Sequence, residues 1–176
     1  MMKNFLLGIV ACTLLLGSCK KDSGSTKSNP KGLSDNSFKI IKPDGSEQTV
    51  TISNVSMVTN NEFSYIARFS VGAASTYDRV AVGFSSMPAD GEYPVMQPPN
   101  GHTSELPAGK AQQNTTFDGV NYFTTTASSG VVTISTVNGK KKVTFENLEL
   151  SKIGTVVAGG TDLPVGSKIT GVIVQP

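Results

Sequence analysis

The side chains best suited to nucleophilic chemistry surround the single histidine of the chain, His102. The nearby serines and carboxylates are Ser85, Ser86, Ser104, Asp90, Glu92 and Glu105. A serine hydrolase needs a nucleophile held against the histidine and a third group that orients the imidazole ring. The sequence contains no Gly-x-Ser-x-Gly motif, which would present such a nucleophile on a sharp turn. We therefore expect no catalytic residue and interpret the protein as non-enzymatic.

Paired carboxylates offer a second chemistry, the hydrolysis of glycosidic bonds. The available carboxylates are Asp44, Asp78, Asp90, Glu92 and Asp118. Three of the four aspartates precede a glycine, a combination typical of turns. The chain has no Asp-x-Asp-x-Asp-Gly calcium loop, and one His with two Cys supplies no multi-histidine or cysteine-rich metal site. We expect no metal and no cofactor, and keep a glycan-acting hydrolase as the alternative function.

The longest stretch without an alternating strand pattern is 86–116, which holds five of the nine prolines. Connections this long are uncommon unless they are functional or disordered. One interpretation is a ligand-binding loop, and the candidate ligand-binding residues in and near it are Tyr77, Tyr93, His102 and Glu105. The other interpretation, which we favour, is a solvated excursion interrupted by a short edge strand at 92–96.

Three consecutive lysines, Lys140 to Lys142, follow a predicted hairpin turn. They could contact an anionic glycan or lipid head group. Lysines at a hairpin tip also protect a sheet edge from aggregation. We favour this second interpretation.

The elements that must position these residues are strands joined by turns. Asn138-Gly139 predicts a two-residue type I′ hairpin, in which Ile134 pairs with Val143 and Val132 with Phe145. Lys42-Pro43-Asp44-Gly45 predicts an earlier hairpin, and the further predicted strands are 55–59, 62–71, 79–85, 121–126 and 168–174. The sequence thus predicts an all-β fold, an antiparallel β-sandwich or barrel-like domain of about 8–10 strands over residues 37–176.

The N-terminal residues 1–18 are typical of a signal peptide that directs export and is not part of the folded domain. Lys3 precedes an apolar run, 5–16, that is too short to span a bilayer permanently. The run ends in Leu16-Gly17-Ser18-Cys19, which resembles the lipobox of bacterial lipoprotein signal peptides. The resemblance implies cleavage after residue 18, acyl chains on Cys19, and anchoring of the protein to the cell outer membrane.

The segment 19–36 is polar at its start and predicts a flexible tether between the lipid and the folded domain. Cys-Lys-Lys-Asp at its beginning resembles the start of surface-exported lipoproteins of Bacteroidetes-type bacteria, although Asp22 is the one acidic residue there. Whether the domain faces the periplasm or the cell surface stays open. The formal net charge of +2 is too close to neutral for a nucleic-acid-binding protein.

A second resemblance covers about residues 60–150. The segment Gly91-Glu92-Tyr93-Pro94-Val95 and the later hairpin led by Gly130 are similar to small Bacteroidetes-type all-β lipoproteins of unknown function. The resemblance implies no functional residue. The function we expect is a non-catalytic binding or accessory module whose partner, besides the membrane, is a glycan or an envelope protein. A hydrolase and a purely structural envelope protein are the alternatives.

Overall fold

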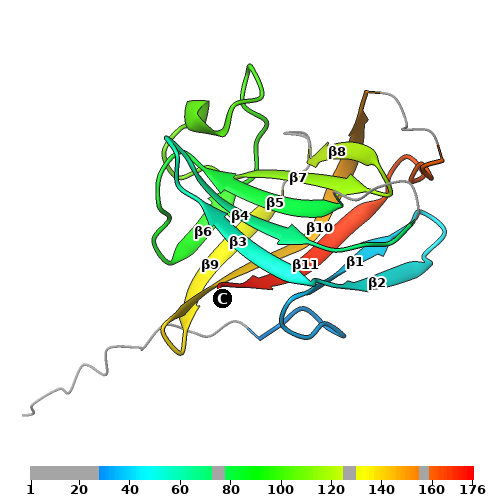
Figure 1. Ribbon diagram of the computed structural model, residues 1–176, viewed down its shortest axis with the longest axis horizontal. Helices are drawn as coiled ribbons and strands as arrows, with labels where there is room; N and C mark the ends of the chain where they lie inside the picture. The colour runs from blue at the N-terminus through cyan, green and yellow to red at the C-terminus, as the bar shows by residue number, and fades with distance from the viewer. Residues whose placement is uncertain (1–27, 73–77, 125–129, 155–158) are drawn as a thin grey trace, which may run out of the picture.

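The structure is a computed structural model that describes residues 28–72, 78–124, 130–154 and 159–176 (Figure 1). These residues form eleven strands and one short 3₁₀ helix, η1 (Thr103–Glu105). The strands are β1 (Ser37–Ile41), β2 (Glu47–Thr51), β3 (Asn54–Val58), β4 (Phe63–Arg68), β5 (Arg79–Phe84), β6 (Gly91–Pro94), β7 (Gln112–Phe117), β8 (Val120–Thr124), β9 (Val131–Val137), β10 (Lys140–Ile153) and β11 (Lys168–Val174). Cys19 and Tyr77 lie outside the described residues.

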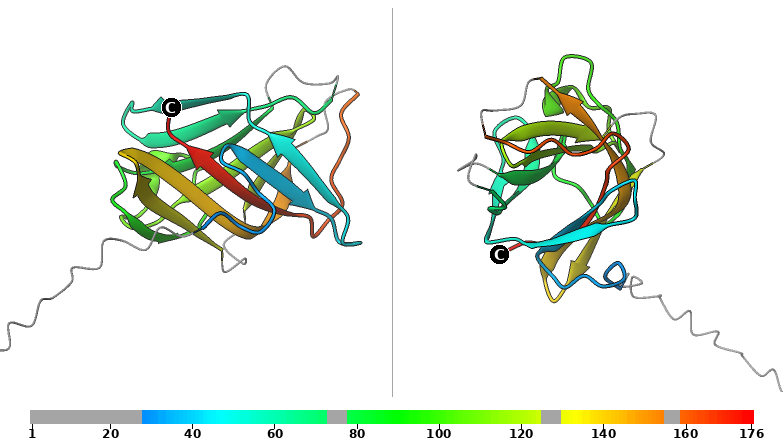
Figure 2. Two further views of the ribbon diagram at one scale, coloured as in Figure 1. Left: turned by 90° about the horizontal axis from the view of Figure 1, so that it is seen from below. Right: turned by 90° about the vertical axis from the view of Figure 1, so that its right-hand side faces the viewer.

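The strands form one antiparallel sheet that curls into a half-barrel (Figure 2). Its order is β2-β1-β11-β10-β8-β7-β5-β4-β3, with β9 paired to β10 and β6 paired to β9. The 14-residue strand β10 turns the sheet, because residues 140–145 pair with β9 and residues 142–149 with β11, while its last four residues pair with β8. The register shifts between Phe145 and Leu148, where the strand bends. The prediction of an all-β, barrel-like antiparallel domain is confirmed.

One parallel bridge joins the residue that follows β6 to the residue that precedes β7. Val95, just after β6, pairs with Ala111, just before β7. The N–H of Met96 donates to the carbonyl of Ala111 at 2.8 Å, and the N–H of Ala111 donates to the carbonyl of Pro94 at 3.1 Å. Strands β6, β9, β10, β8 and β7 are therefore connected in a ring.

Both predicted hairpins are present, and the Asn138-Gly139 hairpin has the predicted register. Ile134 pairs with Val143 and Val132 with Phe145, and all four side chains are buried. Asn138 and Gly139 have φ values of 52° and 76°, as a type I′ turn requires. In the earlier hairpin Phe38 pairs with Val50.

The prediction that 86–116 is a solvated excursion is wrong, because this stretch contains η1 and almost all of β7. The short edge strand predicted at 92–96 is present as β6, at 91–94. Strand β7 lies in the middle of the sheet, between β5 and β8, although its sequence Gln-Gln-Asn-Thr-Thr-Phe is polar. Gln113 is fully buried there: its side-chain oxygen accepts from the Thr124 hydroxyl and its amide donates to the Thr115 hydroxyl, both at 2.5 Å. Polar side chains that satisfy one another can occupy a core position without an apolar sequence pattern.

The folded part of the chain extends before residue 37, into the segment that the sequence assigned to the tether. Leu33 is buried, Asp35 pairs with Lys142 at 3.7 Å, and the Asn36 side-chain oxygen accepts the Val174 N–H at 2.8 Å. Residues 29–36 therefore belong to the folded domain and contact β10 and β11 through Asp35 and Asn36. The predicted tether is left with fewer residues than the range 19–36.

Candidate functional site

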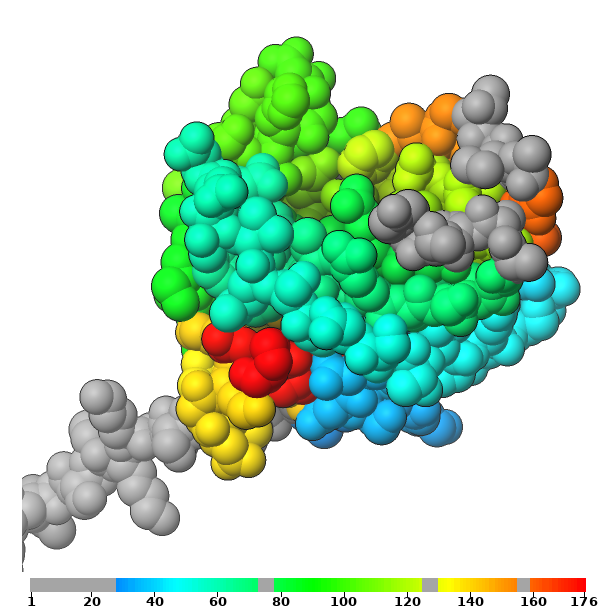
Figure 3. All heavy atoms as spheres, viewed as in Figure 1, coloured from blue at the N-terminus to red at the C-terminus, as the bar shows by residue number. Residues whose placement is uncertain are grey.

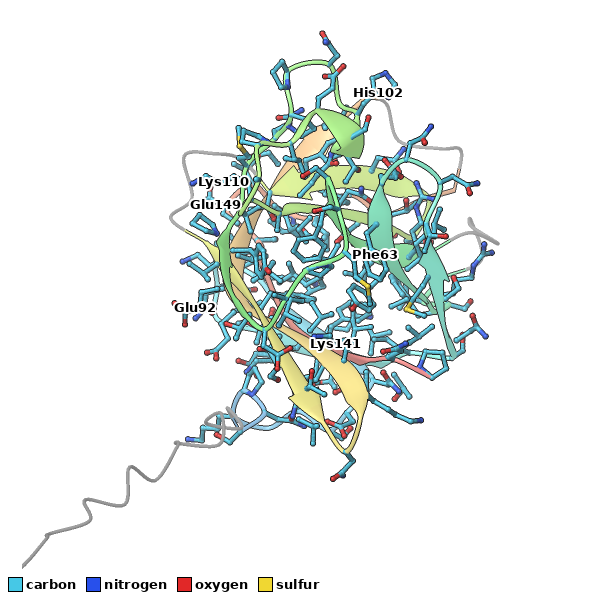
Figure 4. All side chains as sticks on the ribbon, turned by 90° about the vertical axis from the view of Figure 1, so that its left-hand side faces the viewer. Phe63, Glu92, His102, Lys110, Lys141 and Glu149 are labelled. Atoms are coloured by element: carbon cyan, nitrogen blue, oxygen red, sulfur yellow. The ribbon has the colours of Figure 1, made fainter. Side chains whose placement is uncertain are left out.

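Two of the predicted ligand-binding residues, His102 and Glu105, lie on one turn around η1, at the end of the long loop that projects from the barrel (Figures 3 and 4). Both side chains are exposed. The Glu105 carboxylate accepts from the backbone N–H of Asn100 at 3.3 Å and from its side-chain amide at 3.2 Å. Glu105 thus helps to fix the shape of the loop, while His102 stands at its outer end.

The inner side of η1 packs onto the outer face of the sheet through Thr103. The Thr103 hydroxyl donates to the Gln112 side-chain oxygen at 2.8 Å, and Leu106 is buried. Thr103 sits directly over Gly83 of β5, where a Cβ atom would come within 2.5 Å of the threonine methyl group. The loop is therefore a cover for β5 and β7 as well as an exposed projection.

The third predicted residue, Tyr93, is directed into the protein. Its ring meets the Phe84 ring edge to face, with centroids 5.0 Å apart, and its hydroxyl donates to the Ala89 carbonyl at 2.8 Å. Tyr93 is half-buried, and its ring packs against the hydrophobic core. The structure therefore does not join Tyr93 with His102 and Glu105 in one site, and the fourth residue, Tyr77, is outside the described residues.

The aspartates that the sequence offered for glycoside hydrolysis serve other contacts. Asp44 accepts from the backbone N–H and hydroxyl of Ser46 within its turn, which lowers the pKa of its carboxyl group. Asp78 accepts the backbone N–H of Gly119 at 3.2 Å, and Asp118 accepts that of Thr161 at 2.9 Å. Both of these aspartates are buried and tie loops together at one end of the barrel.

Asp90 and the lysines of the hairpin tip form a connection between two elements. The Asp90 carboxylate accepts from the Lys141 ammonium group at 2.6 Å and from Thr136 at 2.8 and 2.9 Å, and the Lys141 contact is the main cause of its lowered pKa. Lys142 is buried beside Asp35. Two of the three lysines are thus paired within the protein, which favours the structural interpretation of the lysine run.

One predicted carboxylate, Glu92, does line a surface hollow. This hollow of about 290 Å³ lies over the outer faces of β6, β9 and β10, and we call it the outer groove. Its lining residues are Ser28, Glu92, Gly130, Val131, Thr133, Thr144, Phe145 and Glu146. Glu92 is opposite Thr133, which is opposite Thr144, so these three form a row across the strands. Figure 4 shows Glu92 on the outside of the barrel.

Glu146 is the residue that reasoning from sequence missed in this groove. The predicted hairpin register could have placed Glu146 on the outer face of the sheet. Residues 133 and 144 alternate onto the outer face, and Glu146 lies two residues beyond Thr144 on the same strand. The groove therefore presents two carboxylates and two threonine hydroxyls from three adjacent strands.

Within the described ranges, no helix is long and apolar enough to cross a bilayer. The same residues contain no group of three or more His, Cys, Asp or Glu side chains placed to hold a metal ion. Comparison of the chain with models of known protein families, with curated proteins and with solved structures gave no match.

Proposed function

We propose that this protein is a lipid-anchored lipoprotein of the cell envelope whose β-domain binds a hydroxyl-rich ligand, a glycan, in the outer groove without catalysing a reaction. The observation that carries the proposal is the convergence of Glu92, Thr133, Thr144 and Glu146 on one hollow. Carboxylate oxygens accept hydrogen bonds from sugar hydroxyls, and threonine hydroxyls both donate and accept. Val131 adds an apolar contact to the same hollow.

The position of the groove supports an accessory role at the membrane. Ser28, the first described residue, lines the groove, and nine peptide units separate it from Cys19. A fully extended chain of that length spans about 30 Å. A lipid on Cys19 would therefore keep the groove close to the bilayer surface, where envelope glycans are attached.

A second candidate function, glycoside hydrolysis, is favoured by one feature of the same groove. Glu92 and Glu146 are two carboxylates on one hollow, as a general acid and a nucleophile or base would be. In the hydrolase one of them would protonate the leaving oxygen, and the other would attack the sugar or activate water.

A binding and cleavage assay tests the proposal. The mature chain with Cys19→Ser, which removes the lipid attachment point, would be screened against envelope and dietary oligosaccharides by calorimetry. Glu92→Gln and Glu146→Gln are each expected to weaken binding of a captured oligosaccharide by about tenfold or more, as loss of a charged hydrogen-bond acceptor does. Glu149→Gln, on β10 but outside the groove lining, is the matched control and should leave the affinity unchanged.

The assay has two outcomes that contradict the proposal. If new reducing ends accumulate with the parent chain and not with the two variants, the protein is the hydrolase and not a simple binding module. If no oligosaccharide binds, or if Glu149→Gln weakens binding as much as the other two changes, the outer groove is not the site.

A further inference from the structure

Strand β3 is the last strand at one end of the sheet, and among the described strands it pairs with β4 alone (Figure 1). In an antiparallel strand, every second residue directs its N–H and C=O groups away from the paired neighbour. The outer edge of β3 therefore carries backbone donors and acceptors with which no described strand pairs. A row of this kind is a template for the addition of a further strand.

The end of β11 comes close to this edge without pairing with it. A hollow of about 240 Å³ lies between the two, and its lining residues are Asn36, Ile52, Ser53, Asn54, Val55, Val174 and Pro176. Within β3, Asn54 and Met57 are exposed, and the other three residues are half-buried. In the described part of the chain, the sheet is therefore open beyond β3.

The sequence of β3 lacks the residues that protect a sheet edge. Charged side chains and prolines discourage an edge strand from pairing with another chain. Edge strand β2 begins with Glu47, which pairs with Lys39 at 2.9 Å, and edge strand β6 contains Glu92 and Pro94. Strand β3, in contrast, reads Asn-Val-Ser-Met-Val, with no charge and no proline. An edge without such protection is suited to pairing with another strand.

The register of β3 against β4 shows which side chain would meet its counterpart in a second copy. Met57 pairs with Tyr65, a buried core residue, whereas Ser56 pairs with the half-buried Ile66. Ser56 therefore lies on the outer face of the sheet, and it is the central residue of the five-residue strand. Antiparallel pairing of two copies along the whole of β3 places Ser56 of one copy opposite Ser56 of the other.

The charges beside β3 favour a second copy in the antiparallel orientation. Arg68 is exposed and lies opposite Asn54, at one end of β3, and Glu62 lies in the turn at the other end. Antiparallel pairing brings the Arg68 end of each copy to the Glu62 end of the other, whereas parallel pairing brings like charges together. The antiparallel arrangement uses the same surface on both copies and closes with two-fold symmetry.

We propose that this protein forms a two-fold dimer in which the β3 strands of two copies pair antiparallel along their free edges. Five residues from each copy make a small contact, so the dimer is a weak one in solution. Attachment of both copies to one membrane, as the proposed lipid on Cys19 would provide, raises their effective concentration. The pairing does not depend on the proposed glycan-binding function, because β3 contributes no residue to the outer groove.

Analytical ultracentrifugation of the mature Cys19→Ser chain, at concentrations up to the submillimolar range, tests this proposal. We expect the parent chain to form a dimer as its concentration rises. Ser56→Lys and Ser56→Glu each place like charges opposite one another and should weaken dimerisation by about tenfold or more. An equimolar mixture of the two variants should restore the dimer, because opposite charges then meet across the two strands.

Ser151→Lys is the matched control. Ser151 is also half-buried, but it lies on β10, where it pairs with Phe123 of β8. This variant should dimerise as the parent chain does. The proposal is overturned if the parent chain stays monomeric at the highest concentration or if Ser56→Lys dimerises as well as the parent. It is also overturned if Ser151→Lys weakens dimerisation as much as Ser56→Lys, or if the mixture dimerises no better than either Ser56 variant alone.

Discussion

At the scale of single residues, Gly171 shows how closely the barrel interior is packed. It lies on β11 between Phe38 on β1 and Phe145 on β10. A Cβ atom at this position would come within 2.4 Å of the Phe145 ring and 2.9 Å of the Phe38 Cβ atom. The two aromatic residues therefore occupy the space that a side chain would need. The glycine is required by packing and not by its backbone conformation.

Gly171→Ala is expected to destabilise the protein by about 1–3 kcal/mol, the usual cost of overpacking a core. The free energy of unfolding in urea measures this effect. Phe145→Leu removes the ring atoms closest to residue 171, so the double variant should lose less stability than the sum of the two single variants. Additive losses would show that the methyl group does not meet the Phe145 ring.

At the scale of elements, the loop between β6 and β7 belongs to the folded structure. Leu106 is 4% exposed, and Thr103 is bonded to Gln112 at the start of β7. Replacement of 97–112 by a short linker would remove these contacts and the first residue of a central strand. A deletion of this size therefore cannot separate a binding role from a structural one, whereas single substitutions can.

Leu106→Ala should cost about 2–5 kcal/mol of stability, because it leaves a cavity beneath the loop. His102→Ala, four residues earlier on the exposed end of the same loop, should change stability little. Thermal and urea unfolding of the two variants would show the difference. Equal stabilities for both would mean that the loop does not contribute to the core.

At the scale of the whole molecule, the N-terminal segment determines where the barrel sits relative to its proposed anchor. Residues 29–36 lie along β10 and β11 and bring the chain to Ser28 beside the outer groove. A lipid attached at Cys19 would thus hold this face of the barrel toward the membrane. The segment from Cys19 to Ser28 would then limit how far the groove can move from the bilayer.

Cys19→Ser, expressed in the native host, should abolish labelling by radioactive fatty acid and release the protein from the membrane fraction. Two or three acyl chains bind a bilayer firmly, at about 0.8 kcal/mol per buried CH₂ group, so their loss should be evident on fractionation. Cys12→Ser, in the segment assigned to the signal peptide, is the matched control and should change neither property. A Cys19→Ser protein that is still labelled would refute the assignment.

The sequence by itself determined the elements whose signals are local. Asn138-Gly139 specified the β9–β10 turn and therefore the pairing of Val132 with Phe145, because a type I′ turn leaves one register. Strand β11 was predicted with its observed bounds, since Ile169, Gly171 and Ile173 alternate with Val172 and Val174 along it. These features, taken together, also gave the all-β class of the fold.

Only the tertiary structure decided the features that depend on distant partners. Gln113 is buried because Thr124 on the next strand satisfies its amide, so β7 has no apolar pattern to reveal it. Tyr93 could not be distinguished in the sequence from an exposed ring until Phe84 was placed beside it. Glu92 and Glu146, 54 positions apart in the sequence, share a groove because β9 lies between their strands. Local patterns record which backbone conformation a segment prefers, whereas burial and site formation depend on which other segments the fold brings to it.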